Sequence, residues 1–215
     1  MGKGPVVECW NEKDRTGPLI TISVAVVGAS QHRVERREHR PCLETVHTLI
    51  RIVSGDILLS QAHAIVHGVA PNDPFSSGLA HALRERWPSM YKDFRHYCQS
   101  RHPEPGGLWT WSGAGDSHVV NLFTQDGAFG HGAKPGKASL ANVNHALKAL
   151  AAEIVKEGYH SVALPRLATG VGGLAWEDVE PLIRSHLAGL GIPVIVYATY
   201  RAGVVADEGL VERVD

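Results

Sequence analysis

Short apolar runs alternate with amphipathic stretches from about residue 46 to about residue 200. Six runs rich in β-branched and aromatic residues predict strands, because such side chains suit the pleated surface of a buried sheet. The six runs are 48–58, 62–70, 108–113, 117–125, 161–167 and 192–200. Four stretches carry apolar residues three or four positions apart, which predicts helices. They are 79–87, 90–98, 140–158 and 176–191.

The stretch 140–158 shows the clearest helical pattern. Its apolar stripe faces one side and consists of Leu140, Val143, Leu147, Leu150, Ile154 and Val155. Ser139 precedes the stripe and is a residue type that caps helix N-termini. Gly158 follows it and predicts the stop. The stretch 79–87 is expected to stop at Pro88.

Strands that alternate with helices predict an α/β layer sandwich around a mostly parallel central sheet. The regular pattern divides the chain into an N-terminal extension (1–45), one domain (46–200) and a C-terminal tail (201–215). In sheets of this kind, ligands bind at the carboxyl ends of the strands. The glycine-rich loops of this chain fall at such ends, so we expect the site there.

Composition excludes several classes of protein. The chain has 215 residues, of which 44% are hydrophobic, and its net charge is −1. Its overall charge therefore does not favour binding to nucleic acid or to an anionic membrane. Its three cysteines form no CxxC pair, which predicts a reducing, cytoplasmic setting. The 13 histidines show no zinc-binding spacing, and we expect neither a metal nor a cofactor.

Two features of the extension leave alternatives open. The apolar run 19–30 is too short to cross a bilayer. We interpret it as a buried strand, as a translated upstream extension or as a poor signal peptide. The basic cluster 32–40 reads as a solvated surface or as a contact for an acidic partner.

The stretch "ATGVGG" (168–173) joins a predicted strand to a predicted helix. It lacks the lysine of a Walker A loop, and it lies too late in the chain for a Rossmann loop. Its glycines still let the backbone turn sharply and present N–H groups to an anion. The alternative is a tight turn that binds nothing.

Three further stretches carry candidate chemistry, and the first two contain Asp56 and residues 66–83. Asp56, at the end of a strand, is either an acceptor for an exocyclic amine or a turn cap. Ser76, Ser77 and Gly78 stand where a helix begins, a place that favours anions. His67 lies near a strand end and is either catalytic or structural.

The fourth candidate is the long loop 126–139, which follows Gln125 and contains His131 and Lys134. Long loops in compact domains often carry function. Asp126 is either a general base or the cap of a turn.

Taken in order, these stretches resemble the macro domain family, which binds ADP-ribose. The resemblance covers about residues 46–200 and rests on "GDI" (55–57), "HGVAPNDPFSSGLAHAL" (67–83) and "ALPRLATGVGGLAWEDV" (163–179). It implies a three-layer α/β/α fold with a mixed, mostly parallel sheet. It also implies a set of ADP-ribose-binding residues: Asp56, Ile57, Ser76, Ser77, Gly78, Gln125, Thr169, Gly170, Val171, Gly172 and Gly173.

Within the family, the chain looks most like the terminal ADP-ribose glycohydrolases, and the ADP-ribose-1″-phosphate phosphatases also have a histidine at the place of His67. The glycohydrolase branch pairs a lysine nucleophile with an aspartate in its phosphate loop. Gln125 and Gly172 stand at those two positions here. A carboxamide cannot form the adduct that an amine forms, so the covalent mechanism of that branch should not transfer.

We therefore expect a hydrolase that releases ADP-ribose from mono-ADP-ribosylated protein, with esters of acidic side chains as the first candidate linkage. Asp126 is the expected activator of the attacking water, and His67 is the second candidate. The alternatives are a reader that binds ADP-ribose without turnover, an ADP-ribose-1″-phosphate phosphatase, or a different α/β nucleotide-binding protein. A nucleic-acid adduct is not indicated by the sequence, and no membrane partner is expected.

Overall fold

The structure is a computed structural model that describes residues 49–115, 117–127, 129, 132 and 134–210. A six-stranded sheet runs through its centre in the order β1-β6-β5-β2-β4-β3. All neighbouring strands are parallel except β3 and β4. The strands are β1 (Ile50–Gly55), β2 (Ala64–Val69), β3 (Leu108–Ser112), β4 (His118–Phe123), β5 (Val162–Pro165) and β6 (Val194–Tyr200).

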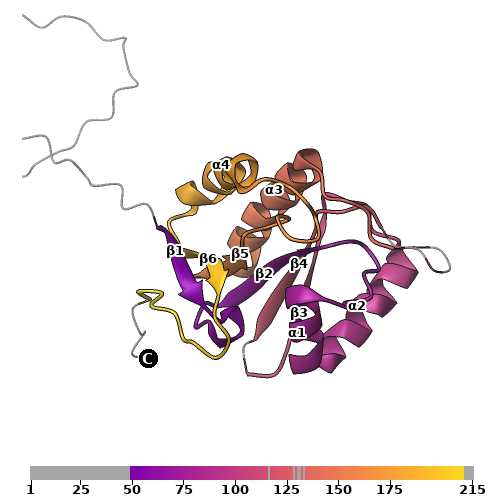
Figure 1. The fold of residues 1–215 in the computed structure, drawn as a ribbon, viewed down its shortest axis with the longest axis horizontal. Helices are drawn as coiled ribbons and strands as arrows, with labels where there is room; N and C mark the ends of the chain where they lie inside the picture. The colour runs from indigo at the N-terminus through magenta and orange to yellow at the C-terminus, as the bar shows by residue number, and fades with distance from the viewer. Residues whose placement is uncertain (1–48, 116, 128, 130–131, 133, 211–215) are drawn as a thin grey trace, which may run out of the picture. The chain divides into compact units, whose positions relative to one another are not determined.

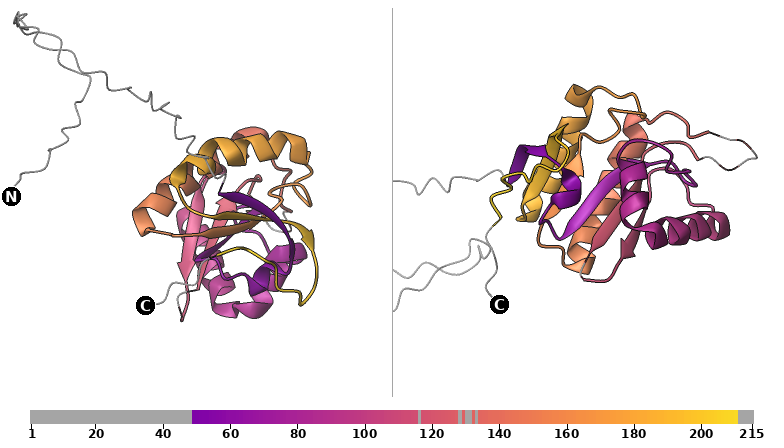
Figure 2. Two further views of the ribbon diagram at one scale, coloured as in Figure 1. Left: turned by 90° about the vertical axis from the view of Figure 1, so that its left-hand side faces the viewer. Right: turned by 60° about the horizontal axis from the view of Figure 1, so that its bottom comes forward.

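Helices cover both faces of the sheet, as Figure 1 and the edge-on view on the left of Figure 2 show. They are α1 (Gly78–Arg86), α2 (Pro88–Arg101), α3 (Leu140–Glu157) and α4 (Trp176–Leu187). Two short 3-10 turns are η1 (Ile57–Leu59) and η2 (Ala188–Leu190). The predicted three-layer α/β/α architecture with a mixed, mostly parallel sheet is confirmed.

The alternation of side chains along the strands divides the core in two. Val66 and Val120 belong to the core that α3 and α4 cover. Their neighbours Ile65 and Val119 belong to the opposite core, which α1 and α2 cover. Successive residues of a strand point to opposite faces, so each central strand supplies apolar side chains to both layers.

The predicted ends of α3 are confirmed. Ser139 Oγ accepts a hydrogen bond from the backbone N–H of Asn142 (3.1 Å), and Gly158 ends the helix with φ of 69°. Glycine adopts this left-handed conformation without the steric cost of a Cβ.

Other boundaries differ from the prediction. Pro88 was expected only as a stop for α1, but it is also the first residue of α2, where a missing N–H is harmless. The helix continues to Arg101, and His102 ends it with φ of 46°. The first strand does end at Gly55, in agreement with the expected end at Gly55-Asp56, and η1 follows because Asp56 caps it.

Residues 201–210 return to the start of the sheet. The backbone N–H of Asp56 donates to Val204 O (2.8 Å), and Gly203 N donates to Asp56 Oδ2 (3.1 Å). We call residues 201–210 the C-terminal strap. The predicted extension 1–45, with its apolar run and basic cluster, lies outside the described residues, as does His131. No helix in the described part of the chain is both long enough and apolar enough to span a membrane.

Candidate functional site

Two adjoining cavities open at the carboxyl ends of the parallel strands. The larger has a volume of about 650 Å³ and the smaller of about 380 Å³. Gly78, Leu79 and Pro165 line both. Because they share this wall, the two cavities form one elongated site with two compartments.

The smaller cavity is built around Asp56 and Ile57. Asp56 Oδ1 accepts from Leu58 N (3.1 Å) and Oδ2 accepts from Gly203 N (3.1 Å), so the side chain does act as a turn cap. A carboxylate offers about four lone-pair positions, and two remain for a ligand. Tyr200 lines the same cavity with 71% of its surface exposed, which leaves its ring free to cover a flat ligand.

Behind this cavity, the strap places a buried acceptor. The Glu208 carboxylate accepts hydrogen bonds from Ser60 Oγ (2.5 Å), Gln61 N (2.8 Å) and Tyr197 OH (2.8 Å). Burial and the bond to Glu208 raise the pKa of Tyr197, so its hydroxyl stays protonated and remains a donor. The strap thereby fixes the floor of the smaller cavity, because Tyr197 lines it.

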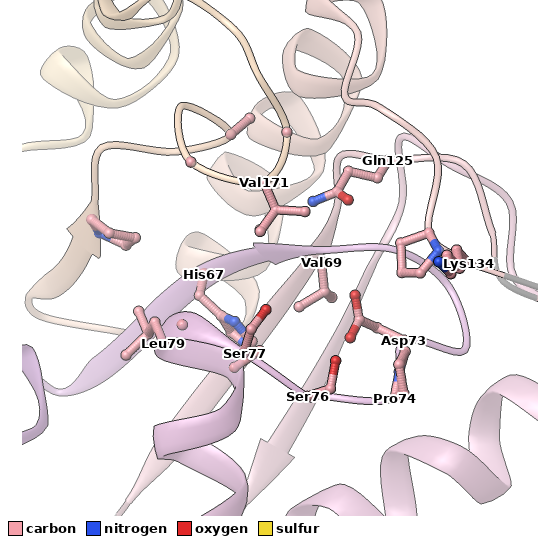
Figure 3. A pocket seen from close by; sticks show the side chains of 18 of the residues that line it. His67, Val69, Asp73, Pro74, Ser76, Ser77, Leu79, Gln125, Lys134 and Val171 are labelled. Carbon is pink, nitrogen blue, oxygen red and sulfur yellow. The ribbon is translucent and has the colours of Figure 1, made fainter.

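The glycine-rich loop forms one wall of the larger cavity. Gly170, Val171 and Gly172 line it, and Figure 3 shows Val171 on that wall. A Cβ at Gly172 would lie 2.5 Å from Ala168 O and 2.9 Å from the Cβ of Ala138. The loop therefore leaves no room for a side chain at position 172.

Two predicted members of this loop do not line either cavity. The Thr169 hydroxyl donates to Arg166 O (2.9 Å). Gly173 has φ of 75° and donates its N–H to Gly170 O (3.1 Å). Both residues thus shape the loop rather than form its inner surface.

The opposite wall is the start of α1. Ser76, Ser77 and Gly78 all line the larger cavity. Ser77 is the N-cap residue, but its side chain makes no cap hydrogen bond. The first N–H groups of the helix are therefore not occupied by a capping side chain, and they can serve an anion.

His67 comes from β2 and is almost fully buried, with 2% of its surface exposed. Nε2 lies 2.7 Å from Asn121 Oδ1 on β4. Burial, partly offset by this hydrogen bond, lowers the pKa of His67 to about 4. The ring also meets Phe75 edge-on, with 5.6 Å between the ring centres. His67 is thus a neutral imidazole at the base of the cavity.

Gln125 follows β4 and lines the larger cavity. Its side chain extends toward Val171 (Figure 3) and is 5% exposed. Within the described residues, Oε1 has no hydrogen-bond partner although it is buried. A buried acceptor without a donor is costly unless a ligand or water supplies one.

Asp126 does not line either cavity, and its side chain is exposed. Its carbonyl accepts from Gly136 N (3.1 Å), and the missing side chain of Gly136 leaves space for the Cβ of Asp126. The structure thus brings Lys134 and Pro135 of this loop to the cavity, and not Asp126.

A different carboxylate, Asp73, lines the larger cavity. In Figure 3 it points into the cavity from the side opposite Gln125. Its Oδ1 accepts from Phe75 N (2.7 Å), and burial raises the pKa of its carboxyl group. The motif 67–83 contains this residue. The pattern of turn-forming residues predicts a loop there, but it does not predict which side chain of the loop faces a cavity.

Two cations also reach the larger cavity, Lys134 and Arg166. The Arg166 guanidinium lies over the Trp176 ring, 5.2 Å from its centre, which holds the cation beside the glycine-rich loop. No group of three or more potential metal ligands occurs among the described residues.

Known proteins resemble this chain over the same region. A model of the Macro domain family matches residues 66–183, more than half of the chain. The "DNA ADP-ribosyl glycohydrolase" of Mycobacterium tuberculosis is 29% identical over 153 residues, which are 69% of this chain and 42% of that protein. The chain thus spans about two fifths of the length of this relative. The "ADP-ribose 1″-phosphate phosphatase" of Meyerozyma guilliermondii is 23% identical over 173 residues, 68% of this chain and 98% of that protein.

Solved structures agree with these matches. The macrodomain of Mycobacterium tuberculosis DarG superposes with a TM-score of 0.62 at 27% identity, covering 69% of this chain and 96% of that one. The macrodomain of Thermus aquaticus DarG gives 0.61 at 26% identity, covering 69% and 97%.

Proposed function

The chain belongs to the macro domain family, and from that premise we propose that it binds ADP-ribose and hydrolyses the bond that attaches ADP-ribose to a macromolecule. One observation carries the proposal: an elongated site with two compartments that meet at Gly78, Leu79 and Pro165. ADP-ribose likewise has two ends joined by a pyrophosphate.

The chemistry of each part suggests how the ligand is oriented. The smaller cavity offers a carboxylate, Asp56, for an exocyclic amine and an exposed ring, Tyr200, for a base. We assign the adenine to it. The pyrophosphate then lies between the glycine-rich loop and the start of α1, where backbone N–H groups favour anions.

This orientation puts the distal ribose in the part of the larger cavity away from the shared wall, near Asp73 and Gln125, while His67 lies closer to Leu79 (Figure 3). All three offer acceptors, and ribose hydroxyl groups are the matching donors. The rim there is open, because Ser76, Lys134 and Val171 are exposed. A macromolecule attached to C1″ can therefore stay outside the cavity, which supports a large substrate.

We propose that water is the nucleophile for cleavage in this site. The oxygen of water bonds to C1″, the bond from C1″ to the leaving group breaks, and the electron pair departs with the leaving group. Gln125 cannot replace water by forming an adduct, because a carboxamide nitrogen is not nucleophilic. The neutral His67 can hold a ribose hydroxyl, since an imidazole without its second proton has one acceptor nitrogen.

A reader without turnover is the second candidate, and Gln125 and Gly172 favour it, because both catalytic positions of the glycohydrolase branch are altered. We prefer the hydrolase because the cavity retains another carboxylate, Asp73. The linkage we expect first is the ester to an acidic protein side chain. Because relatives are named DNA ADP-ribosyl glycohydrolase, ADP-ribosylated DNA is a second candidate substrate.

Two measurements test the proposal. Calorimetric titration with ADP-ribose should show one-to-one binding, and absence of binding removes both candidates. The protein should then release ADP-ribose from a substrate modified on acidic side chains, from an ADP-ribosylated oligonucleotide, or from both. Binding without release above the spontaneous rate from either substrate would leave the reader. Phosphate release from ADP-ribose-1″-phosphate alone would identify a phosphatase instead.

A further inference from the structure

The loop between β2 and α1 is held from outside by two arginines. Arg95 Nη1, from α2, donates to Asn72 O (2.6 Å). Arg84 Nη1, from α1, donates to Pro74 O (3.3 Å). The backbone on each side of Asp73 is therefore fixed by a charged donor, and hydrogen bonds of this kind are stronger than neutral ones.

The same loop contains strained backbone. Asn72 has φ of 60° and Phe75 has φ of 51°, both in the left-handed region. For a bulky residue such as phenylalanine this conformation is costly. It is retained because the Phe75 ring is fully buried against Phe94 and Tyr91, with ring centres 4.8 and 5.4 Å apart. Such strain persists where the surroundings enforce it, and it concentrates at functional sites.

Between these two strained residues, Asp73 is presented to the larger cavity. The hydrogen bond from Phe75 N to Oδ1 fixes the carboxylate (2.7 Å). Across the cavity stands Gln125, whose buried Oε1 has no donor within the described residues (Figure 3). Asp73 and Gln125 thus offer two acceptors to the same cavity, and a water molecule has two hydrogens to donate.

We propose that Asp73 is the catalytic carboxylate that activates the attacking water, and that Gln125 Oε1 orients this water by accepting its second hydrogen. The inference rests on the hydrolase function proposed above and gives it a mechanism. Water loses a proton to Asp73 as its oxygen bonds to C1″. The bond to the leaving group breaks, and the proton passes from Asp73 to the leaving group or to solvent.

The surroundings of Asp73 suit a base. Burial raises the pKa of its carboxyl group, while backbone N–H groups and the charge of Arg95 act in the opposite direction. Cys98 faces it from α2, and burial raises the pKa of that thiol, which keeps it uncharged. Lys134 lines the same cavity from the loop 126–139, and His67 is neutral above about pH 4. The rate should therefore rise with pH as Asp73 deprotonates.

The variant Asp73→Asn removes the negative charge of the side chain and keeps its size and shape. Asparagine keeps an oxygen that accepts from Phe75 N, so the loop retains its hydrogen bond, but it cannot take a proton. We expect the rate of ADP-ribose release to fall about 100-fold or more, since general bases contribute about 10²–10⁴. The dissociation constant for ADP-ribose should change less than about tenfold, because only the one acceptor that Asp73 offers to a ribose hydroxyl is replaced by a donor.

Asp126→Asn is the matched control, because it makes the same change at an exposed carboxyl outside the cavity. Its release rate should equal that of the wild type. If Asp126→Asn loses release and Asp73→Asn keeps more than about a tenth of it, the proposal is wrong. A wild type that binds ADP-ribose but releases none removes the hydrolase function itself, and this inference with it.

Two further readouts separate catalysis from folding. Asp73→Glu should restore part of the lost rate, and Gln125→Ala should lower kcat more than it raises KM. If Asp73→Asn fails to fold, the pH dependence of the wild-type release rate still tests the proposal. A release rate that does not fall on acidification, at pH values where the protein is folded, overturns the role of Asp73.

Discussion

His67 and Asn121 are paired across β2 and β4, and His67 Nε2 donates to Asn121 Oδ1 over 2.7 Å. The direction of this bond follows from Asn121 itself, because its Nδ2 donates to Trp109 O (3.3 Å) and its oxygen must then face His67. With the proton on Nε2, the neutral ring keeps a lone pair on Nδ1. Trp109 O therefore sets the orientation of the Asn121 amide. Asn121 in turn leaves Nδ1 as the nitrogen of His67 that can accept a hydrogen bond.

The buried neutral His67 predicts a pH dependence of stability. Its pKa is about 4 in the folded protein and 6.5 ordinarily, so between these values only the unfolded chain binds the proton. The free energy of unfolding should therefore fall as pH falls from 6.5 to 4, by on the order of 3 kcal/mol. Urea denaturation at several pH values across this window measures the slope.

His67→Gln should abolish this part of the pH dependence of the free energy of unfolding, because glutamine does not titrate. An unchanged slope in His67→Gln would show that other groups cause the dependence.

Tyr200 should contribute affinity through its exposed ring at the smaller cavity. Stacking of a base on an aromatic side chain is worth about 1–3 kcal/mol. Tyr200→Ala should therefore weaken ADP-ribose binding about tenfold or more, while Tyr200→Phe, which keeps the ring, should bind like the wild type. Calorimetry measures both, and equal losses in the two variants would implicate the hydroxyl group instead of the ring.

The glycine-rich loop provides a pair of substitutions with opposite expectations. Gly172→Ala should disturb the loop and weaken ADP-ribose binding, because the new Cβ would lie 2.5 Å from Ala168 O. At Gly170 a Cβ would meet nothing within 4 Å, so Gly170→Ala should bind nearly normally. Parallel titrations with ADP-ribose compare the two, and equal affinities would mean that the loop adapts.

The strap should stabilise the domain through Glu208. Glu208→Ala leaves the hydroxyls of Ser60 and Tyr197 and the N–H of Gln61 without their acceptor. Each unsatisfied buried donor costs about 1–3 kcal/mol, so the free energy of unfolding should fall by at least that amount. Asp207→Ala, at the exposed neighbouring position, removes only the exposed hydrogen bond from Gly209 N (3.1 Å) and should cost less than Glu208→Ala. Chemical denaturation of both variants checks the difference.

The sequence predicts the parts of this fold that depend on local pattern. Ser139 and Gly158 mark the two ends of α3 because caps act within one helical turn. We expected the site at the carboxyl ends of the strands, and His67, Ser77 and Gln125 line one cavity there, while their roles stay predictions.

Side-chain contacts explain what the sequence leaves out. Asp73 faces the cavity from a loop whose backbone carbonyls accept hydrogen bonds from Arg84 and Arg95, on the two helices that follow it. No spacing rule encodes these contacts. The role of Glu208 cannot be read from local pattern either, because two of its three partners, Ser60 and Gln61, are separated from it by 148 and 147 positions.

The absence of space at Gly172 makes two loops dependent on each other. A side chain there meets Ala138 as well as Ala168, and Ala138 N already donates to Gly172 O (3.1 Å). Introducing an aspartate at this position would require both loops to be rebuilt together. An engineer who wished to graft the lysine–aspartate pair onto this scaffold could exchange Gln125 alone, but could not complete the pair by point substitution.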